Sequence, residues 1–207
     1  GSWRPPRTDG SGRDRETARR ALDLLRAAGF TLDAEGLRRK STGEPFTFEI
    51  LVVSRDQERL ALSFSKSLAR IGVTARVRLV DSVQFQRRRQ RFEFDVTIAA
   101  WPVSPSPGNE QFFRFGAASA GREGSFNFAG VRSPAVDAMI NAMLAARTRP
   151  EFVAATRALD RTLLSGFYVV PLFHLPETWI ARDAQLRKPA QAPLLGTSIE
   201  LWWRPAP

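Results

Sequence analysis

Strand and helix patterns alternate between residues 46 and 101, and this alternation limits the chain to a small set of folds. Three segments are rich in β-branched and aromatic residues: FTFEILVV (46–53), VTARVRLV (73–80) and FDVTIAAW (94–101). Apolar residues recur at helical spacing over 56–71, and Asp81 can cap a short helix that runs to about Phe92. Helices placed between successive strands in this way cross over the sheet and join parallel strands with a right-handed turn. The sequence therefore predicts an α/β fold with a mostly parallel central sheet flanked by helices.

Helix and turn signals precede this segment. Asp14 is a suitable N-cap for an amphipathic helix that ends before Gly29. FTLDAEGLRR (30–39) has short extended arms around an Asp-Ala-Glu-Gly turn, which predicts a hairpin.

Helix signals also follow it. Ser133-Pro134 and the capping box of Thr148 and Glu151 mark the starts of two further helices. FYVVPLFHL (167–175) is strand-like, but Pro171 lacks an N–H donor and restricts it to a sheet edge or an irregular crossing segment. ETWIAR (177–182) could pair beside it.

Three regions are expected along the chain. Residues 1–13 are polar and predicted to be a linker or a tag-derived disordered end. Residues 14–182 form the α/β region. Residues 183–207 are rich in proline and are expected to dock on something outside the chain.

The net charge of +10 raises a nucleic-acid-binding or scaffold module as one possible function. However, the basic residues are almost all arginines and are spread along the chain. Their densest run, QRRRQRF (86–92), falls on a predicted helix, where a solvated face explains it. We therefore expect no nucleic acid partner and keep that module as the alternative function.

The chain has no apolar run of about 18 residues for a membrane span. Its first residues lack a signal-peptide core, so we expect a cytoplasmic chain, a processed one or a fragment.

Motifs for catalysis are missing from the sequence. It holds no cysteine, no G-x-S-x-G elbow and no glycine-rich phosphate loop. The one histidine, His174, lies in an apolar run, where a packed residue is more common than a catalytic one. We expect no catalytic residues, no metal and no cofactor, and hence no enzyme.

WPVSPSPGNEQFF (101–113) is the segment best suited to hold a ligand, because it follows the third predicted strand. Ligands of open α/β sheets bind beyond the carboxyl ends of the strands. The candidate ligand-binding residues here are Trp101, Ser104, Ser106, Asn109, Glu110 and Gln111. The prolines stiffen this loop and lower the ordering cost of binding. From the residues alone, a rigid surface turn with Trp101 and Phe112 packed underneath is an equally good reading.

Several stretches resemble the second lobe of the bacterial extracellular solute-binding proteins of family 5, the peptide- and nickel-binding receptors of ABC importers. They are ARRALDLLRAAGF, LARIGVTARVRLVD, FQRRRQRFEFDVTIAAW, GSFNFAGVRSPAVDAMINAM and LDRTLLSGFYVVPLF. SPSPGNEQFF looks like the version in one oligopeptide-binding branch. The likeness runs from about residue 14 to about residue 182.

This resemblance implies a type II periplasmic binding protein whose two lobes close on a peptide-like or other small solute. The chain would be the carboxyl-terminal lobe, and residues 183–207 would return to the missing lobe. The partner would be a membrane permease, with the receptor monomeric, periplasmic or extracellular, and only peripheral to the membrane. By analogy, Trp101 and its loop line the cleft, and Asn127 lies in the matching FNFAG segment.

One position departs from the resemblance. Many peptide-binding members carry an Asp shortly after the strand-end aromatic, which pairs with the α-amino group of the peptide. Here residues 102–106 hold no acid, and the first one is Glu110. Either Glu110 replaces that Asp, or the solute is not held through a free amine. A peptide backbone could still bind through main-chain hydrogen bonds.

Overall fold

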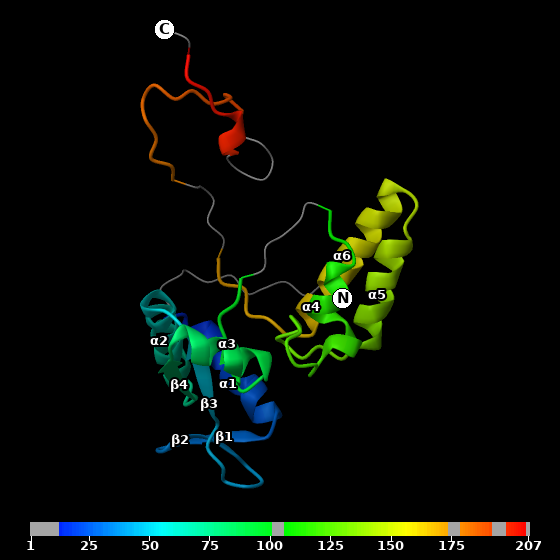
Figure 1. The fold of residues 1–207 in the computed structure, drawn as a ribbon. Coiled ribbons are helices and arrows are strands. Elements are labelled where there is room, and N and C mark those ends of the chain that lie inside the picture. The colour runs from blue at the N-terminus through cyan, green and yellow to red at the C-terminus, as the bar shows by residue number, and fades with distance from the viewer. Residues whose placement is uncertain (1–12, 101–105, 174–178, 192–197, 206–207) are drawn as a thin grey trace. The chain divides into compact units, whose positions relative to one another are not determined.

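The structure is a computed structural model that describes residues 13–100, 106–173, 179–191 and 198–205 (Figure 1). The chain divides into two compact units, Gly1–Val169 and Val170–Pro207. The α-helices are α1 (Arg15–Ala27), α2 (Arg55–Ala69), α3 (Ser82–Gln90), α4 (Glu110–Phe115), α5 (Pro134–Ala145) and α6 (Arg149–Ser165). The strands are β1 (Phe30–Asp33), β2 (Gly36–Arg39), β3 (Thr47–Val52), β4 (Thr74–Leu79) and β5 (Val96–Thr97). Short 3-10 turns cover η1 (Ala117–Ser119) and η2 (Ile199–Leu201).

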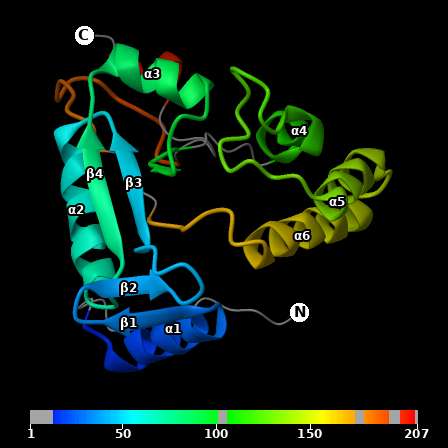
Figure 2. The ribbon, with the colours of Figure 1, turned by 90° about the horizontal axis from the view of Figure 1, so that it is seen from below.

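A parallel sheet in the order β4-β3-β5 confirms the predicted α/β fold. Strand β3 is central, and α2 lies along one face of the sheet (Figure 2). On that face Ile50, Val52, Ala61 and Ala75 are buried together. Ile50, Leu51 and Val52, the second half of β3, keep almost no exposed surface, and they form the continuous apolar run typical of a covered parallel strand.

Glu49 organises polar contacts on the other side of β3. Its Oε1 accepts a hydrogen bond from Arg88 Nη2 of α3 at 2.8 Å, and its Oε2 accepts one from Arg78 Nε of β4. Its backbone N–H donates to Asp95 Oδ2, just before β5, at 2.8 Å. Burial acts to raise the pKa of Glu49, but the hydrogen bonds and positive charges of Arg88 and Arg78 outweigh it and lower the pKa. One half-buried carboxylate thus joins β3, β4 and α3.

The third strand is shorter than predicted. Of FDVTIAAW, only Val96 and Thr97 form strand β5, which pairs with Ile50 and Leu51 of β3. Residues 98–100 are irregular, and Trp101 lies outside the described residues. Among the described residues, strand β5 has a partner on one side only, so few backbone hydrogen bonds hold it extended.

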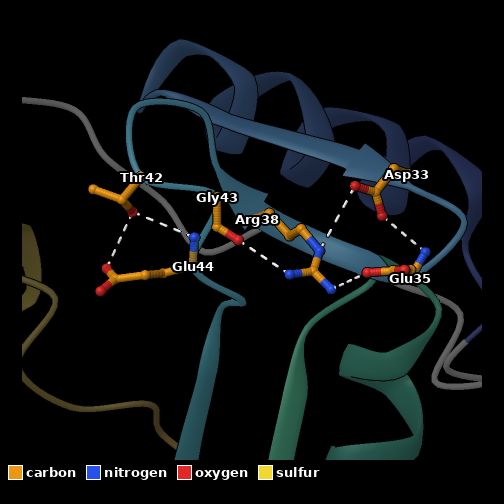
Figure 3. A network of polar contacts seen from close by, with 6 residues as sticks. All are labelled: Asp33, Glu35, Arg38, Thr42, Gly43 and Glu44. Carbon is orange, nitrogen blue, oxygen red and sulfur yellow. Dashed lines mark hydrogen bonds and ion pairs between the residues drawn. The ribbon is translucent and has the colours of Figure 1, made fainter.

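The amino-terminal region confirms the predicted helix and hairpin. Asp14 caps α1 by accepting from the N–H groups of Glu16 and Thr17, and β1 pairs antiparallel with β2 across the turn. Polar contacts fix this hairpin: Arg38 pairs with Asp33 and Glu35 and donates to the Gly43 carbonyl at 3.1 Å (Figure 3).

Gly72 ties that hairpin to the parallel sheet. It follows α2 with a φ of +78°, and its carbonyl accepts a hydrogen bond from the N–H of Leu37 in β2 at 2.8 Å. A Cβ at this position would lie 2.9 Å from the Leu37 nitrogen and overlap the Leu32 side chain. Only glycine satisfies both the backbone angle and the close approach.

Helices α5 and α6 run side by side and form a second hydrophobic cluster (Figures 1 and 2). Its buried members are Val131, Val136, Ile140, Met143 and Leu159. The predicted caps are present: Ser133 accepts from the Val136 N–H, and Thr148 and Glu151 form a capping box. Local cap chemistry was enough to predict where both helices begin.

The strand-like segments after α6 do not form strands in the described residues. Residues 167–173 and 179–182 are irregular, so the expected pairing of 177–182 is wrong for its described part. The bridge between Arg187 and Trp203 is the pairing found in the described part of Val170–Pro207. His174 lies outside the described residues. No helix in the described ranges is long and apolar enough to cross a membrane.

Replacing Glu49 tests the importance of its ion pairs. Glu49→Gln should lower the free energy of unfolding at neutral pH by about 1–2 kcal/mol, because Arg88 loses a charged partner. Since the pKa of Glu49 is lowered in the folded state, its contribution is present above the ordinary carboxyl pKa and is lost as pH falls through the folded value. Urea unfolding at several pH values measures both effects.

The matched control for that experiment is Asp56→Asn, which breaks the exposed pair of Asp56 with Arg59 on α2. This control should change stability by less than about 0.5 kcal/mol. Equal losses in the two variants would contradict the role given to Glu49.

Candidate functional site

The candidate site lies where the chain leaves β5, at the carboxyl end of the parallel sheet. Trp101 and Ser104 fall outside the described residues, so their predicted roles stay predictions. Ser106 and Asn109 are exposed. Asn109 is the residue before α4 and makes no capping hydrogen bond with its side chain.

Residues 110–113 belong to helix α4, which the sequence analysis treated as loop. Phe112 packs against the α5–α6 cluster, and Gln111 is 9% exposed. Phe113, on the next position, is 60% exposed. The packing of Phe112 that the surface-turn alternative assumed is therefore present, while Phe113 is an exposed aromatic that the sequence analysis did not single out.

The carboxylate of Glu110 turns back onto its own backbone. Oε1 and Oε2 accept from the Gly108 N–H at 2.9 and 3.0 Å, and Oε1 also accepts from Gln111 Nε2 at 3.0 Å. The hydrogen bond from the Gly108 N–H is the main cause that lowers the pKa of Glu110. Glu110 therefore carries a full negative charge at neutral pH, and that charge is used to close the turn before α4.

Asn127 is 0% exposed and fastens the segment between α4 and α5. Its Nδ2 donates to the carbonyls of Gly116 and Val131, both at 3.0 Å, and its Oδ1 accepts from the Val131 N–H at 2.9 Å. Direct contact with a solute stays a prediction for this residue. In the described structure it acts on the candidate site indirectly, by holding the end of α4.

Three further side chains brace this segment, and the sequence analysis missed them. Ser119 Oγ donates to the Gly116 carbonyl at 2.7 Å, Ser125 Oγ donates to the Ser119 carbonyl at 2.7 Å, and Asp137 Oδ1 accepts from the Ala117 N–H at 3.0 Å. For Ser119 and Ser125, small polar residues among glycines between two helices were the available signal, whereas Asp137 lies in the first turn of α5. Together with Asn127 they fix the backbone of the loop over residues 116–131 through side-chain hydrogen bonds.

Aromatic side chains line the outer surface of the same loop. Phe126 is 56% exposed and contacts Phe128 edge to face, with ring centroids 5.9 Å apart. The guanidinium of Arg89, on α3, lies 4.9 Å from the Phe128 ring centroid. This cation–π contact links the loop to α3.

A charged hollow lies elsewhere, on the sheet. It has a volume of about 600 Å³ and none of the predicted site residues lines it. Its charged lining residues are Glu49, Arg55, Glu58, Arg76, Arg78 and Asp95. Ion pairs join Glu49 to Arg78 and Arg55 to Glu58 across this lining. Across the described ranges, no three His, Cys, Asp or Glu side chains gather as a metal site would require.

The sequence matches the family model described as "Bacterial extracellular solute-binding proteins, family 5 Middle" over residues 3–122. This range includes the hairpin, the whole parallel sheet and helix α4. The match therefore covers more than half of the 207 residues and the main candidate segment.

Curated relatives extend the similarity to nearly the whole chain. A protein of Brucella melitensis, named only as a binding protein, is 51% identical over 203 residues, which are 98% of this chain and 33% of that protein. The peptidoglycan-binding protein YepA of Agrobacterium fabrum is 40% identical over 203 residues, with the same coverage of 98% and 33%. The chain thus spans about a third of the length of these relatives.

The solved structures agree on the fold. The oligopeptide-binding protein AppA of Bacillus subtilis, in complex with a nonapeptide, has a TM-score of 0.70 to this chain at 16% identity. The match covers 91% of this chain and 37% of that one. The predicted likeness to a lobe of the type II periplasmic binding proteins is confirmed.

Asn127 offers a direct test of how the loop is held. Asn127→Ala should lower the free energy of unfolding by about 2–3 kcal/mol, because buried backbone groups of Gly116 and Val131 lose their partners. Thermal unfolding monitored by circular dichroism measures the loss.

Asn141→Ala is the control. Asn141 makes one exposed hydrogen bond, to the Asp137 carbonyl on α5, so its removal should cost less than about 0.5 kcal/mol. A loss for Asn127→Ala no larger than that of the control would rule out its bracing role.

Proposed function

The chain belongs to family 5 of the bacterial extracellular solute-binding proteins, and on that basis we propose that it is one lobe of a receptor that captures a peptide-like solute for an ABC importer. The observation that carries this proposal is the family match over residues 3–122, which includes both the sheet and the segment after β5. In this proposal the lobe binds and releases, and it performs no catalytic step.

A peptide-like solute is supported by what similar proteins bind. YepA, at 40% identity, is named for peptidoglycan, a polymer that contains short peptides, and AppA was solved with a nonapeptide. Peptide backbones offer many N–H and C=O groups, so a cleft can hold them with little dependence on side-chain identity. Nickel receptors share the fold, but the described residues hold no cluster of metal ligands.

The proposed contact surface is the segment after β5 with the loop beside it. Trp101, Ser104, Ser106 and Asn109 would face the solute, and Glu110, Gln111 and Asn127 would set the backbone that presents them. Support comes from the exposure of Ser106 and Asn109 and from the inward hydrogen bonds of Glu110 and Asn127. The exposed side chains of Phe113 and Phe126 would add aromatic contact area to this surface.

The organisation of the chain follows from the same proposal. Residues 14–182 would form the lobe, and residues 183–207 would dock on the part of the receptor outside this chain. The exposure of Ile199, Leu201 and Trp203, at 73%, 47% and 50%, supports a docking role, because isolated apolar side chains gain stability when covered. The receptor would act as a monomer, in the periplasm or outside the cell, and meet the membrane through a permease.

Identifying the co-purified solute is the most informative experiment. Native mass spectrometry of the full-length protein should reveal a bound mass in the peptide range that denaturation releases. Sequencing the released mass by fragmentation would assign it. Recovery of nucleic acid, with an affinity that falls steeply as salt rises, would instead support the alternative built on the arginine excess.

Trp101 provides the matched mutational test. In the full-length receptor, Trp101→Ala should weaken binding of the identified solute at least tenfold and leave the melting temperature nearly unchanged, because a cleft aromatic stabilises the ligand and not the core. Calorimetric titration and thermal unfolding give the two readouts. A large fall in melting temperature with binding intact would show that Trp101 packs in the interior.

A further inference from the structure

Helix α3 contacts both the parallel sheet and the loop over residues 116–131, through two adjacent arginines. Arg88 donates from Nη2 to Glu49 Oε1 of β3 at 2.8 Å. The guanidinium of Arg89 lies 4.9 Å from the ring centroid of Phe128 in the loop. Consecutive residues of a helix point about 100° apart, so such a pair can hold two different neighbours. Helix α3 therefore joins the loop to the sheet.

The guanidinium of Arg89 is held in place from its own helix. It lies 5.4 Å from the ring centroid of Phe85, one turn earlier, and its Nη2 donates to Gln86 Oε1 at 2.7 Å. Phe85 is 4% exposed, so that ring is fixed in the interior. Because Arg89 is already oriented, little side-chain freedom is lost when Phe128 contacts it.

The loop also completes the carboxyl end of α3. The Gln90 carbonyl, at the last residue of the helix, accepts a hydrogen bond from the Gly124 N–H at 3.1 Å. The last four carbonyls of a helix have no partner within it, so a loop amide satisfies a group that the helix cannot. The ion pair of Arg91 with Glu123, at 3.6 Å, adds a weak, exposed contact beside it.

The backbone directly after α3 is strained. Phe92 has a φ of +57°, in the left-handed region that residues with a side chain rarely adopt. Such conformations persist where the surrounding contacts hold them. Here the N–H of Glu93 donates to the Arg88 carbonyl at 2.9 Å, and the Gly124 N–H holds the Gln90 carbonyl. The end of α3 is thus held both by its own chain and by the loop.

The hydrogen bonds inside the loop do not involve α3. Asn127 joins Gly116 to Val131, and Asp137 Oδ1 accepts from the Ala117 N–H at 3.0 Å. These bonds can stay formed when the contacts of the loop with α3 break. The loop can therefore separate from α3 without losing its own fold.

We propose that Arg89 is the latch of a conformational device, in which the loop over residues 116–131 opens away from α3 and closes again as one braced unit. In the closed form Arg89 contacts Phe128 and Gly124 caps α3. In the open form both contacts are broken, the hydrogen bonds of Asn127 remain, and exposed Phe126 moves with the loop. The inference goes beyond the proposed function and holds whichever solute the receptor takes.

Hydrogen–deuterium exchange of the full-length receptor, read at single amides by fragmentation in the mass spectrometer, tests the latch. The Gly124 N–H leaves its acceptor when the loop opens, whereas the Val131 N–H leaves Asn127 only when the loop itself unfolds. Arg89→Ala should speed exchange at Gly124 at least about threefold, as expected for the loss of a partly exposed cation–π contact. Exchange at Val131 should change by less than about twofold, because its acceptor lies within the loop.

Arg87→Ala is the matched control, because it removes the same charge from an exposed position of the same helix. It should leave exchange at both amides within about twofold of the unaltered receptor. Equal acceleration of Gly124 and Val131 in Arg89→Ala would mean that the loop unfolds instead of opening. A smaller acceleration at Gly124, or an equal one in Arg87→Ala, would mean that Arg89 is no latch. Each of these results overturns the inference.

Phe128→Leu identifies the partner through which Arg89 acts. It keeps an apolar side chain but removes the ring, so alone it should speed exchange at Gly124 by a factor similar to that of Arg89→Ala. In the double variant, Arg89→Ala should add less than about twofold, because its partner in the loop is already missing. Factors that multiply would show that the two residues act separately, and would contradict the proposal. Phe128→Leu tests the same contact from the loop side if Arg89→Ala fails to fold.

Discussion

The burial of strand β3 is the constraint on which the rest of the lobe depends. Ile50, Leu51 and Val52 retain at most 2% of their surface, so the strand needs a neighbour at each edge and a cover on each face. Strands β4 and β5 supply the edges and α2 covers one face. On the other face, Glu49 forms ion pairs with Arg78 and Arg88, so that these charged side chains lie against the sheet with their charges paired.

Features fixed by neighbouring residues were predictable from the sequence. Asp14, Ser133 and Thr148 cap helices through N–H groups two or three positions away, and the Asp-Ala-Glu-Gly turn needs only its own residues. Strand β5 was overestimated because extended structure depends on a partner that local sequence does not reveal. The segment after α6 is irregular, one of the two forms that Pro171 allowed: Val170, Leu172 and Phe173 suit a strand, yet no described segment pairs with them.

At the candidate site, sequence predicted the kinds of side chain but not their directions. Glu110 and Gln111 were taken as ligand contacts because they are polar residues in a loop after a strand. Their place in the first turn of α4 lets Glu110 reach back to Gly108 and Gln111 sink inward. Nothing in the sequence around Asn127 indicates that Gly116 and Val131 will enclose its side chain. Polar atoms that serve a loop and polar atoms that serve a ligand have the same composition, and only tertiary packing separates them.

The described part of the lobe region has two hydrophobic clusters, one between the sheet and α2 with Ile98 at its edge, and one between α5 and α6 with Phe112 at its edge. The thirteen residues between those two positions contain most of the proposed contact surface. A solute held there would add contacts to the chain segment that connects the two clusters. Binding there would raise the cooperativity of unfolding, because it would add to the Arg89–Phe128 contact that already joins the two parts.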